Sequence, residues 1–167
     1  MMRRLAVALS LLVPTVSLAA QDAPLTVFVV RHAEKGPETA DPSLTEAGQR
    51  RAAVLTRTLT DTRVSALFAS EFKRAQETLA PLARATGLTA VVVPAAKMDE
   101  LIAQLRALPP GSRAVVASHS NLVHLIVERL SGQKVPLLTD LDYDRLVVVT
   151  VQGEGKGQAL VLRYGEP

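Results

Sequence analysis

The sequence has 167 residues, of which 48% are hydrophobic, with 19 Lys and Arg against 16 Asp and Glu. This length suits one domain with a real core and is too short for two large lobes. The absence of cysteine excludes disulfide scaffolds, cysteine-based zinc sites, iron–sulfur clusters and thiol nucleophiles. Only 3% of the residues are aromatic and no basic stripe runs between them, so a nucleic-acid partner is not expected.

The first twenty residues have the three-part pattern of a secretory signal peptide. Arg3 and Arg4 precede an apolar run of about fourteen residues, which ends at the small residues Ala19 and Ala20. We predict a signal peptide over residues 1–20, a mature domain over 21–167, and a periplasmic or secreted bacterial protein. Because a bilayer span needs roughly 20 apolar residues, no stable membrane anchor is expected after cleavage. An uncleaved anchor is the alternative.

From Leu25 onward, short β-branched runs alternate with longer amphipathic segments, as in βαβ units. The first helix is predicted over residues 43–59, with Ser43 and Glu46 in capping-box register. Gly48 lies inside this helix at a cost of about 1 kcal/mol relative to alanine. The alternation predicts an α/β fold, a three-layer α/β/α sandwich with a mostly parallel central sheet. The strands are predicted over 25–30, 64–69, 89–93, 113–118, 146–151 and 159–163, and the other helices over 72–85, 98–108 and 121–130.

Histidines and arginines follow three of these strands, at the edge where parallel sheets bind ligands. Arg31 and His32 end the first strand, Arg74 follows the second, and His119 and Ser120 follow the fourth. Guanidinium groups offer planar forks that match phosphate oxygens, and the start of a helix at Ser120 adds backbone donors. These features predict a binding site for a dianion.

A neutral imidazole is also a competent nucleophile at phosphorus. His32 is next to Arg31 in the sequence, and the predicted topology brings Arg74 to the same sheet edge. Their positive charge disfavours the protonated form of His32, which leaves a ring nitrogen free to attack.

Four segments in this order resemble motifs of the histidine phosphatase (phosphoglycerate mutase-like) superfamily. They are RHAEK at 31–35, DPSLTEAG at 41–48, SEFKRAQET at 70–78 and SHSN at 118–121. The chain is most similar in size to the compact phosphohistidine-phosphatase-like members. The resemblance implies a phosphohistidine on His32, formed while Arg31, Arg74 and His119 hold the transferring phosphoryl group. Ser120 is expected to bind phosphate as well.

The resemblance further implies no metal and no cofactor, and a substrate that is a small phosphorylated molecule or a phosphoprotein. Many members carry, after the third strand, a glutamate that protonates the leaving group. Glu100 stands in that region and is the candidate, although the surrounding family pattern is missing. The expected function is therefore an exported phosphomonoesterase that acts on a phosphate ester or phosphoamidate. The oligomeric state is left open.

Other interpretations of the same residues remain. The alternative function is a phosphate-ligand binding protein with negligible turnover, whereas a mutase is disfavoured by size and export. His124 is about 140° around a helix from His119, so the two side chains do not share a face and a zinc site formed by them is disfavoured. Ser120 lacks the motif of a serine nucleophile. Glu34 and Lys35 could belong to the pocket rim or be surface ions.

Residues 142–145 precede a late strand and are interpreted as a packed turn rather than as part of the site. The alternative is that Tyr143 and Asp144 come close to the histidines. Ser70 and Thr78 are expected to support the site or to start a helix.

Overall fold

The computed structural model describes residues 23–38, 40–153 and 156–166. The predicted signal peptide, residues 1–20, lies outside this part of the chain. No helix among the described residues is long and apolar enough to span a bilayer. The elements in chain order are β1 (Leu25–Arg31), α1 (Glu46–Leu59), η2 (Thr60–Thr62), β2 (Ala66–Ala69), α2 (Lys73–Thr86), β3 (Ala90–Val92), α3 (Met98–Arg106), β4 (Arg113–Ser118), α4 (Ser120–Ser131), β5 (Arg145–Gly153) and β6 (Lys156–Arg163).

The strands form one six-stranded sheet in the order β3-β2-β4-β1-β5-β6. Strands β3, β2, β4 and β1 pair in parallel, whereas β5 pairs antiparallel with both β1 and β6. Within the described sheet, β5 alone therefore runs against the other strands. The mostly parallel sheet predicted from the alternation of elements is confirmed. Its central strands β4 and β1 are neighbours, so their carboxyl ends lie side by side.

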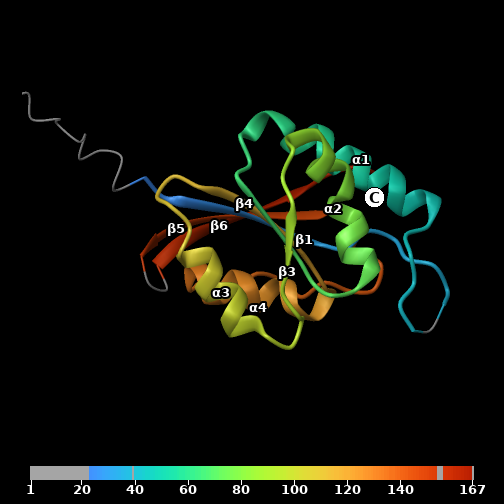
Figure 1. Ribbon diagram of the computed structural model, residues 1–167. Coiled ribbons are helices and arrows are strands. Elements are labelled where there is room, and N and C mark those ends of the chain that lie inside the picture. The colour runs from blue at the N-terminus through green and yellow to red at the C-terminus, as the bar shows by residue number, and fades with distance from the viewer. Residues whose placement is uncertain (1–22, 39, 154–155, 167) are drawn as a thin grey trace, which may run out of the picture.

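Helices cover both faces of the sheet, α1 and α2 on one and α3 and α4 on the other (Figure 1). The residues of β1 alternate between the two cores, as the period of a strand requires. Val27 and Val29 pack with α3 and α4, and Phe28 and Val30 pack with α1 and α2. The three-layer α/β/α architecture is confirmed.

The first helix begins three residues later than predicted. Its N-cap is Thr45, whose side-chain oxygen accepts a hydrogen bond from the backbone N–H of Gly48. Ser43 is not the cap, because its carbonyl pairs with Gly36 across the bridge that joins Lys35 to Leu44. The capping-box prediction is therefore wrong in its register, and Ser43 instead helps to hold the segment between β1 and α1 in place.

Gly48 is required by a close approach of two backbone segments. A Cβ atom at this position would lie 2.3 Å from the carbonyl oxygen of Glu34. The same oxygen accepts the backbone N–H of Thr45, at 2.9 Å. The glycine thus lets α1 press against the segment that follows His32.

We expect Gly48→Ala to destabilise the protein by about 1 to 3 kcal/mol, because overpacking outweighs the gain in helix propensity. The control is Ala53→Gly at an exposed position of the same helix, which should cost about 1 kcal/mol from propensity alone. Urea unfolding measures both. A Gly48→Ala variant more stable than the wild type would contradict the close approach.

Candidate functional site

The two histidines meet at the carboxyl ends of the central strands. Arg31 and Ser118 are register partners in β1 and β4, and the backbone N–H of His32 donates to the carbonyl of Ser118 at 2.8 Å. His119 follows directly, so the two imidazole rings lie 5.3 Å apart between centroids, edge to face. Both side chains are buried. The convergence predicted from the topology is therefore present.

The surroundings of His32 fix its tautomer. Its Nδ1 lies 2.8 Å from the carbonyl oxygen of Ala33. Because a carbonyl can only accept, Nδ1 carries the hydrogen and Nε2 keeps its lone pair. His32 thus presents an unprotonated nitrogen on the side of the ring away from its own backbone.

Both imidazoles are held neutral. Burial, the largest cause, together with the positive charges of Arg31 and Arg74, lowers the pKa of His32 to about 3, although the hydrogen bond to Ala33 acts in the opposite direction. Burial, then Arg74, lowers the pKa of His119 to about 4. Since both arginines act on both rings, the four groups share one electrostatic environment.

Each arginine keeps one buried donor without a partner. Arg31 Nε and Arg74 Nε are buried and have no hydrogen-bond partner among the described residues. Buried polar groups are normally hydrogen-bonded, and an exception calls for an explanation. An anion held between the arginines would satisfy both atoms at once.

His119 is positioned by its neighbours in the segment between β2 and α2. Its Nε2 shares a hydrogen bond of 2.9 Å with the hydroxyl of Ser70, and its ring packs edge to face on Phe72, with centroids 5.1 Å apart. It is also the N-cap residue of α4, which begins at Ser120. The first backbone N–H groups of a helix have no intrahelical acceptor, so those of α4 are available to an anion.

The DPSLT segment holds the start of α2, and with it Arg74. Asp41 accepts the backbone N–H of Lys73 at 3.0 Å and lies 3.8 Å from Arg74 Nη1. In return, Glu77 accepts the backbone N–H of Leu44 at 2.7 Å. The motifs at 41–48 and 70–78 therefore bind each other, and their contacts position Arg74.

The segment after His32 is fixed from two other sides. The backbone N–H of Ala33 donates to the hydroxyl of Thr78 at 2.9 Å, which confirms a supporting place for Thr78. Glu34 binds the buried guanidinium of Arg51 at 2.7 Å, so its carboxylate is neither a free surface ion nor part of the imidazole cluster. Lys35 is exposed at its bridge to Leu44.

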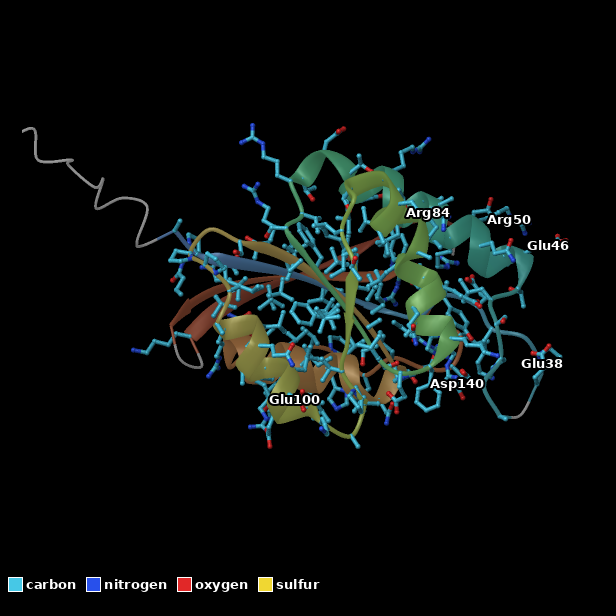
Figure 2. All side chains as sticks on the ribbon, in the orientation of Figure 1. Glu38, Glu46, Arg50, Arg84, Glu100 and Asp140 are labelled. Carbon is cyan, nitrogen blue, oxygen red and sulfur yellow. The ribbon has the colours of Figure 1, made fainter. Side chains whose placement is uncertain are left out.

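Glu100 is not among the residues that converge here. Within the described chain its carboxylate contacts Lys97 at 3.2 Å and Gln104 at 3.2 Å, both on or next to its own helix. Figure 2 shows it on α3, well apart from Asp140, whose carboxylate lies 3.8 Å from Arg31 Nη2. Glu100 therefore gains no contact that would support a role as proton donor.

Tyr143 lies beside the histidines, as the alternative interpretation of residues 142–145 proposed, rather than only in a packed turn. Its ring centroid lies 4.0 Å from the guanidinium carbon of Arg31 and 6.2 Å from the ring of His32. Asp144, by contrast, is buried and paired with Arg145 and Arg163. The turn is thus packed through Asp144 and contributes to the site through Tyr143.

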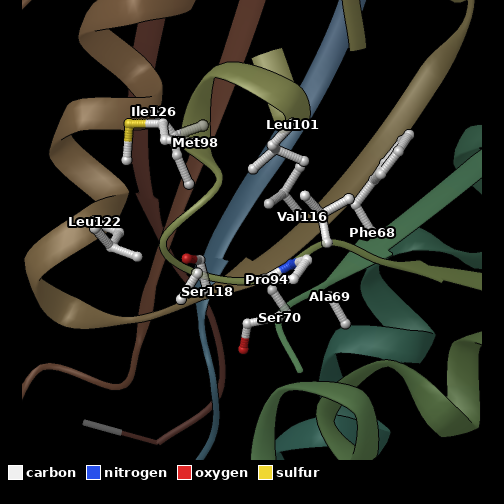
Figure 3. A pocket seen from close by; sticks show the side chains of 13 residues that line it. Phe68, Ala69, Ser70, Pro94, Met98, Leu101, Val116, Ser118, Leu122 and Ile126 are labelled. Carbon is white, nitrogen blue, oxygen red and sulfur yellow. The ribbon is translucent and has the colours of Figure 1, made fainter. Parts of the chain in front are cut away.

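A small apolar cavity adjoins the histidines between the sheet and helices α3 and α4 (Figure 3). Its volume of about 10 Å³ is enough for roughly one water molecule. The hydroxyl-bearing residues of its lining are Ser70 and Ser118. A cavity of this volume is too small to hold a phosphate ester.

Among the described residues, no group of three or more His, Asp or Glu side chains could hold a metal ion. His124 lies on α4 with its Nδ1 buried and without a hydrogen-bond partner in the described chain. The groups that converge at the site are two neutral imidazoles, two guanidinium groups and a helix start.

A family model confirms the resemblance that the motifs suggest. The model of the histidine phosphatase superfamily, branch 1, matches residues 27–100. This stretch includes Arg31, His32 and Arg74. The comparison with curated proteins gives no match.

Solved structures of two phosphatases and of a hydrolase share the fold. The protein histidine phosphatase SixA complexed with tungstate is 24% identical, with a TM-score of 0.70 over 83% of this chain and 96% of that one. Mycobacterial glucosyl-3-phosphoglycerate phosphatase is 15% identical, with a TM-score of 0.67 over 84% and 99%. Mycobacterial hydrolase 1 is 13% identical, with a TM-score of 0.65 over 81% and 95%. At these identities the likeness establishes the fold.

We expect the two histidines to make the protein less stable in acid. Their pKa values lie below the ordinary 6.5 in the folded state, so the unfolded chain binds more protons as the pH falls from about 6.5 towards 3 and 4. Above pH 6.5 the two histidines are neutral in both states and do not affect stability. Below that pH they lower the free energy of unfolding.

Urea unfolding at pH 7.5 and pH 5 tests this, with a His32→Asn/His119→Asn double variant as the comparison. The wild type should lose more stability over this interval than the double variant. Equal losses would show that the imidazoles do not carry the effect.

Proposed function

We propose that this chain is a phosphomonoesterase that forms a phosphohistidine on His32. The observation that carries the proposal is the pair of buried, unpartnered Nε atoms of Arg31 and Arg74 beside two neutral imidazoles. A phosphate ester supplies a compact dianion with several acceptor oxygens. The match of residues 27–100 to the histidine phosphatase family and the tungstate in the SixA structure support the same conclusion.

In the first step, Nε2 of His32 attacks phosphorus and the bond from phosphorus to the leaving oxygen breaks. The leaving oxygen takes the electron pair and requires a proton. The arginines and the N-terminus of α4 stabilise the negative charge on the equatorial oxygens. The hydrogen bond from Nδ1 to Ala33 holds the ring in the attacking tautomer and becomes stronger as the ring gains positive charge.

In the second step, water attacks phosphorus and the bond from phosphorus to Nε2 breaks. The electron pair returns to the imidazole, which is again neutral, and phosphate leaves. Burial and the two positive charges favour this return, because they disfavour a charged His32. His119 lies 5.3 Å away and contributes a ring hydrogen or a lone pair, according to its tautomer with Ser70.

We expect His32→Ala to reduce turnover of an aryl phosphate by at least about 10³-fold, because the nucleophile is removed. Quenching the wild type in alkaline denaturant should retain a phosphoryl group that acid releases, and the variant should retain none. Steady-state assays and phosphate analysis of the quenched chain provide the two measurements.

His124→Ala is the matched control, since this histidine of α4 is not among the ring contacts and hydrogen bonds that His32 and His119 make in the described chain. It should keep both turnover and the trapped phosphoryl group. Equal background rates in the wild type and His32→Ala, with phosphate still bound, would instead favour a phosphate-ligand binding protein.

The leaving group tests the proton donor. Glu100→Gln should change the turnover of alkyl and aryl phosphates by the same factor, within about twofold, because the contacts of its carboxylate within the described residues are to Lys97 and Gln104. Parallel assays with one ester of each kind measure the ratio. Selective loss of the alkyl activity would restore Glu100 as the acid.

The function proposed includes export to the periplasm or the medium. Its support is the pattern of residues 1–20, with Arg3 and Arg4 before an apolar run and Ala19 and Ala20 after it. Expression of the full chain in a bacterium should yield a periplasmic product that begins after Ala19 or Ala20. Mass spectrometry of the periplasmic and cytoplasmic fractions measures this. The intact chain in the cytoplasm would contradict export.

A further inference from the structure

We infer that Tyr143 is a positioning residue that orients the guanidinium of Arg31 towards the phosphoryl group. The inference rests on the proposed function, and it concerns the segment between α4 and β5, which no motif covers. Arg31 Nη1 donates to the carbonyl of Thr139 at 2.9 Å, and Nη2 donates to the hydroxyl of Tyr143 at 3.3 Å. The outer edge of the guanidinium is therefore held by this segment.

The inner edge of Arg31 stays free. A guanidinium has five N–H donors in a fixed plane. One hydrogen of Nη1 and one of Nη2 are engaged and Asp140 lies 3.8 Å from Nη2, so a ligand at the edge formed by Nε and Nη2 would bind the unpartnered Nε. Nε is buried and unpartnered among the described residues. This edge has the spacing of two phosphoryl oxygens.

Arg74 has a corresponding arrangement on the other side of the histidines. Its guanidinium carbon lies 4.4 Å from the ring centroid of Phe72, compared with 4.0 Å between Arg31 and Tyr143. A carboxylate lies 3.8 Å from an Nη atom of each arginine, Asp41 for Arg74 and Asp140 for Arg31. Both arginines are thus supported by an aromatic ring while their Nε atoms stay unpaired.

The segment that carries Tyr143 is itself anchored. Asp142 accepts the backbone N–H and the hydroxyl of Thr139, at 2.8 and 2.7 Å, and binds Arg145 at 3.1 Å. Asp144 binds both Arg145 on β5 and Arg163 on β6. The tyrosine ring is therefore fixed relative to the sheet, as a residue that fixes another must be.

Substitutions at Tyr143 separate the ring from the hydroxyl. Tyr143→Phe keeps the stacking surface and loses one hydrogen bond, so kcat/KM should fall by about 2- to 10-fold. Tyr143→Leu loses the cation–π contact as well, and a fall of about 10- to 100-fold is expected. Tyr164→Phe is the matched control, because that hydroxyl is buried beside Arg51 without a partner in the described chain. It should leave kcat/KM unchanged.

A double-mutant cycle with Arg31→Lys tests whether Tyr143 acts through Arg31. Lysine keeps the charge but lacks the planar fork that the ring orients. In the Arg31→Lys background, Tyr143→Leu should change kcat/KM by less than about twofold. An equal loss in both backgrounds, in variants with wild-type circular dichroism, would overturn the inference.

The same cycle measured by calorimetric binding of tungstate needs no turnover. It should show the same coupling, so it separates a failure of this inference from a failure of the proposed function. Additive losses of tungstate affinity would contradict the positioning role. Coupled losses in a protein without turnover would keep that role and reject the phosphatase.

Discussion

The site depends on positive charge that is buried without a closely paired anion. Arg31 is 4% exposed and the Arg74 side chain 14%, and the carboxylates beside them, Asp140 and Asp41, lie 3.8 Å from the guanidinium groups. Burying charge without close pairing is unfavourable, and the protein limits that cost by keeping His32 and His119 neutral. A tetrahedral dianion between the arginines would balance the positive charge of both guanidinium groups. The same feature makes His32 a nucleophile, since its lone pair is not occupied by a proton.

The fold maintains this arrangement with backbone contacts rather than with paired ions in the pocket. The carbonyl of Ser118 receives the backbone N–H of His32, which joins the ends of β1 and β4. Thr78 on α2 holds the backbone of Ala33, and Gly48 lets α1 approach the carbonyl of Glu34. Because these contacts converge on the residues after β1, the imidazole of His32 is preorganised before substrate binds. Preorganised groups need little rearrangement in the transition state.

The sequence predicts the sheet and the central residues because both follow from local patterns. Alternating strands and helices place strand ends together, which is enough to bring Arg31, His32 and His119 to one edge. Tyr143 was expected near the histidines only as an alternative, because its contact with Arg31 spans 112 residues and the segment before β5 has no periodic pattern. The position of Glu100 could have been inferred, since Leu101, Ile102 and Leu105 form the buried face of α3 and leave Glu100 outside it.

The state of His32 in the free protein is the most direct test of this account. Nitrogen-15 NMR of the imidazoles, recorded from pH 7.5 to pH 4.5, reports both protonation and tautomer. We expect a neutral His32 ring with its hydrogen on Nδ1 down to about pH 5. We also expect the signals of both His32 and His119 to change when tungstate is added. A His32 ring that titrates near 6.5 and does not respond to tungstate would contradict it.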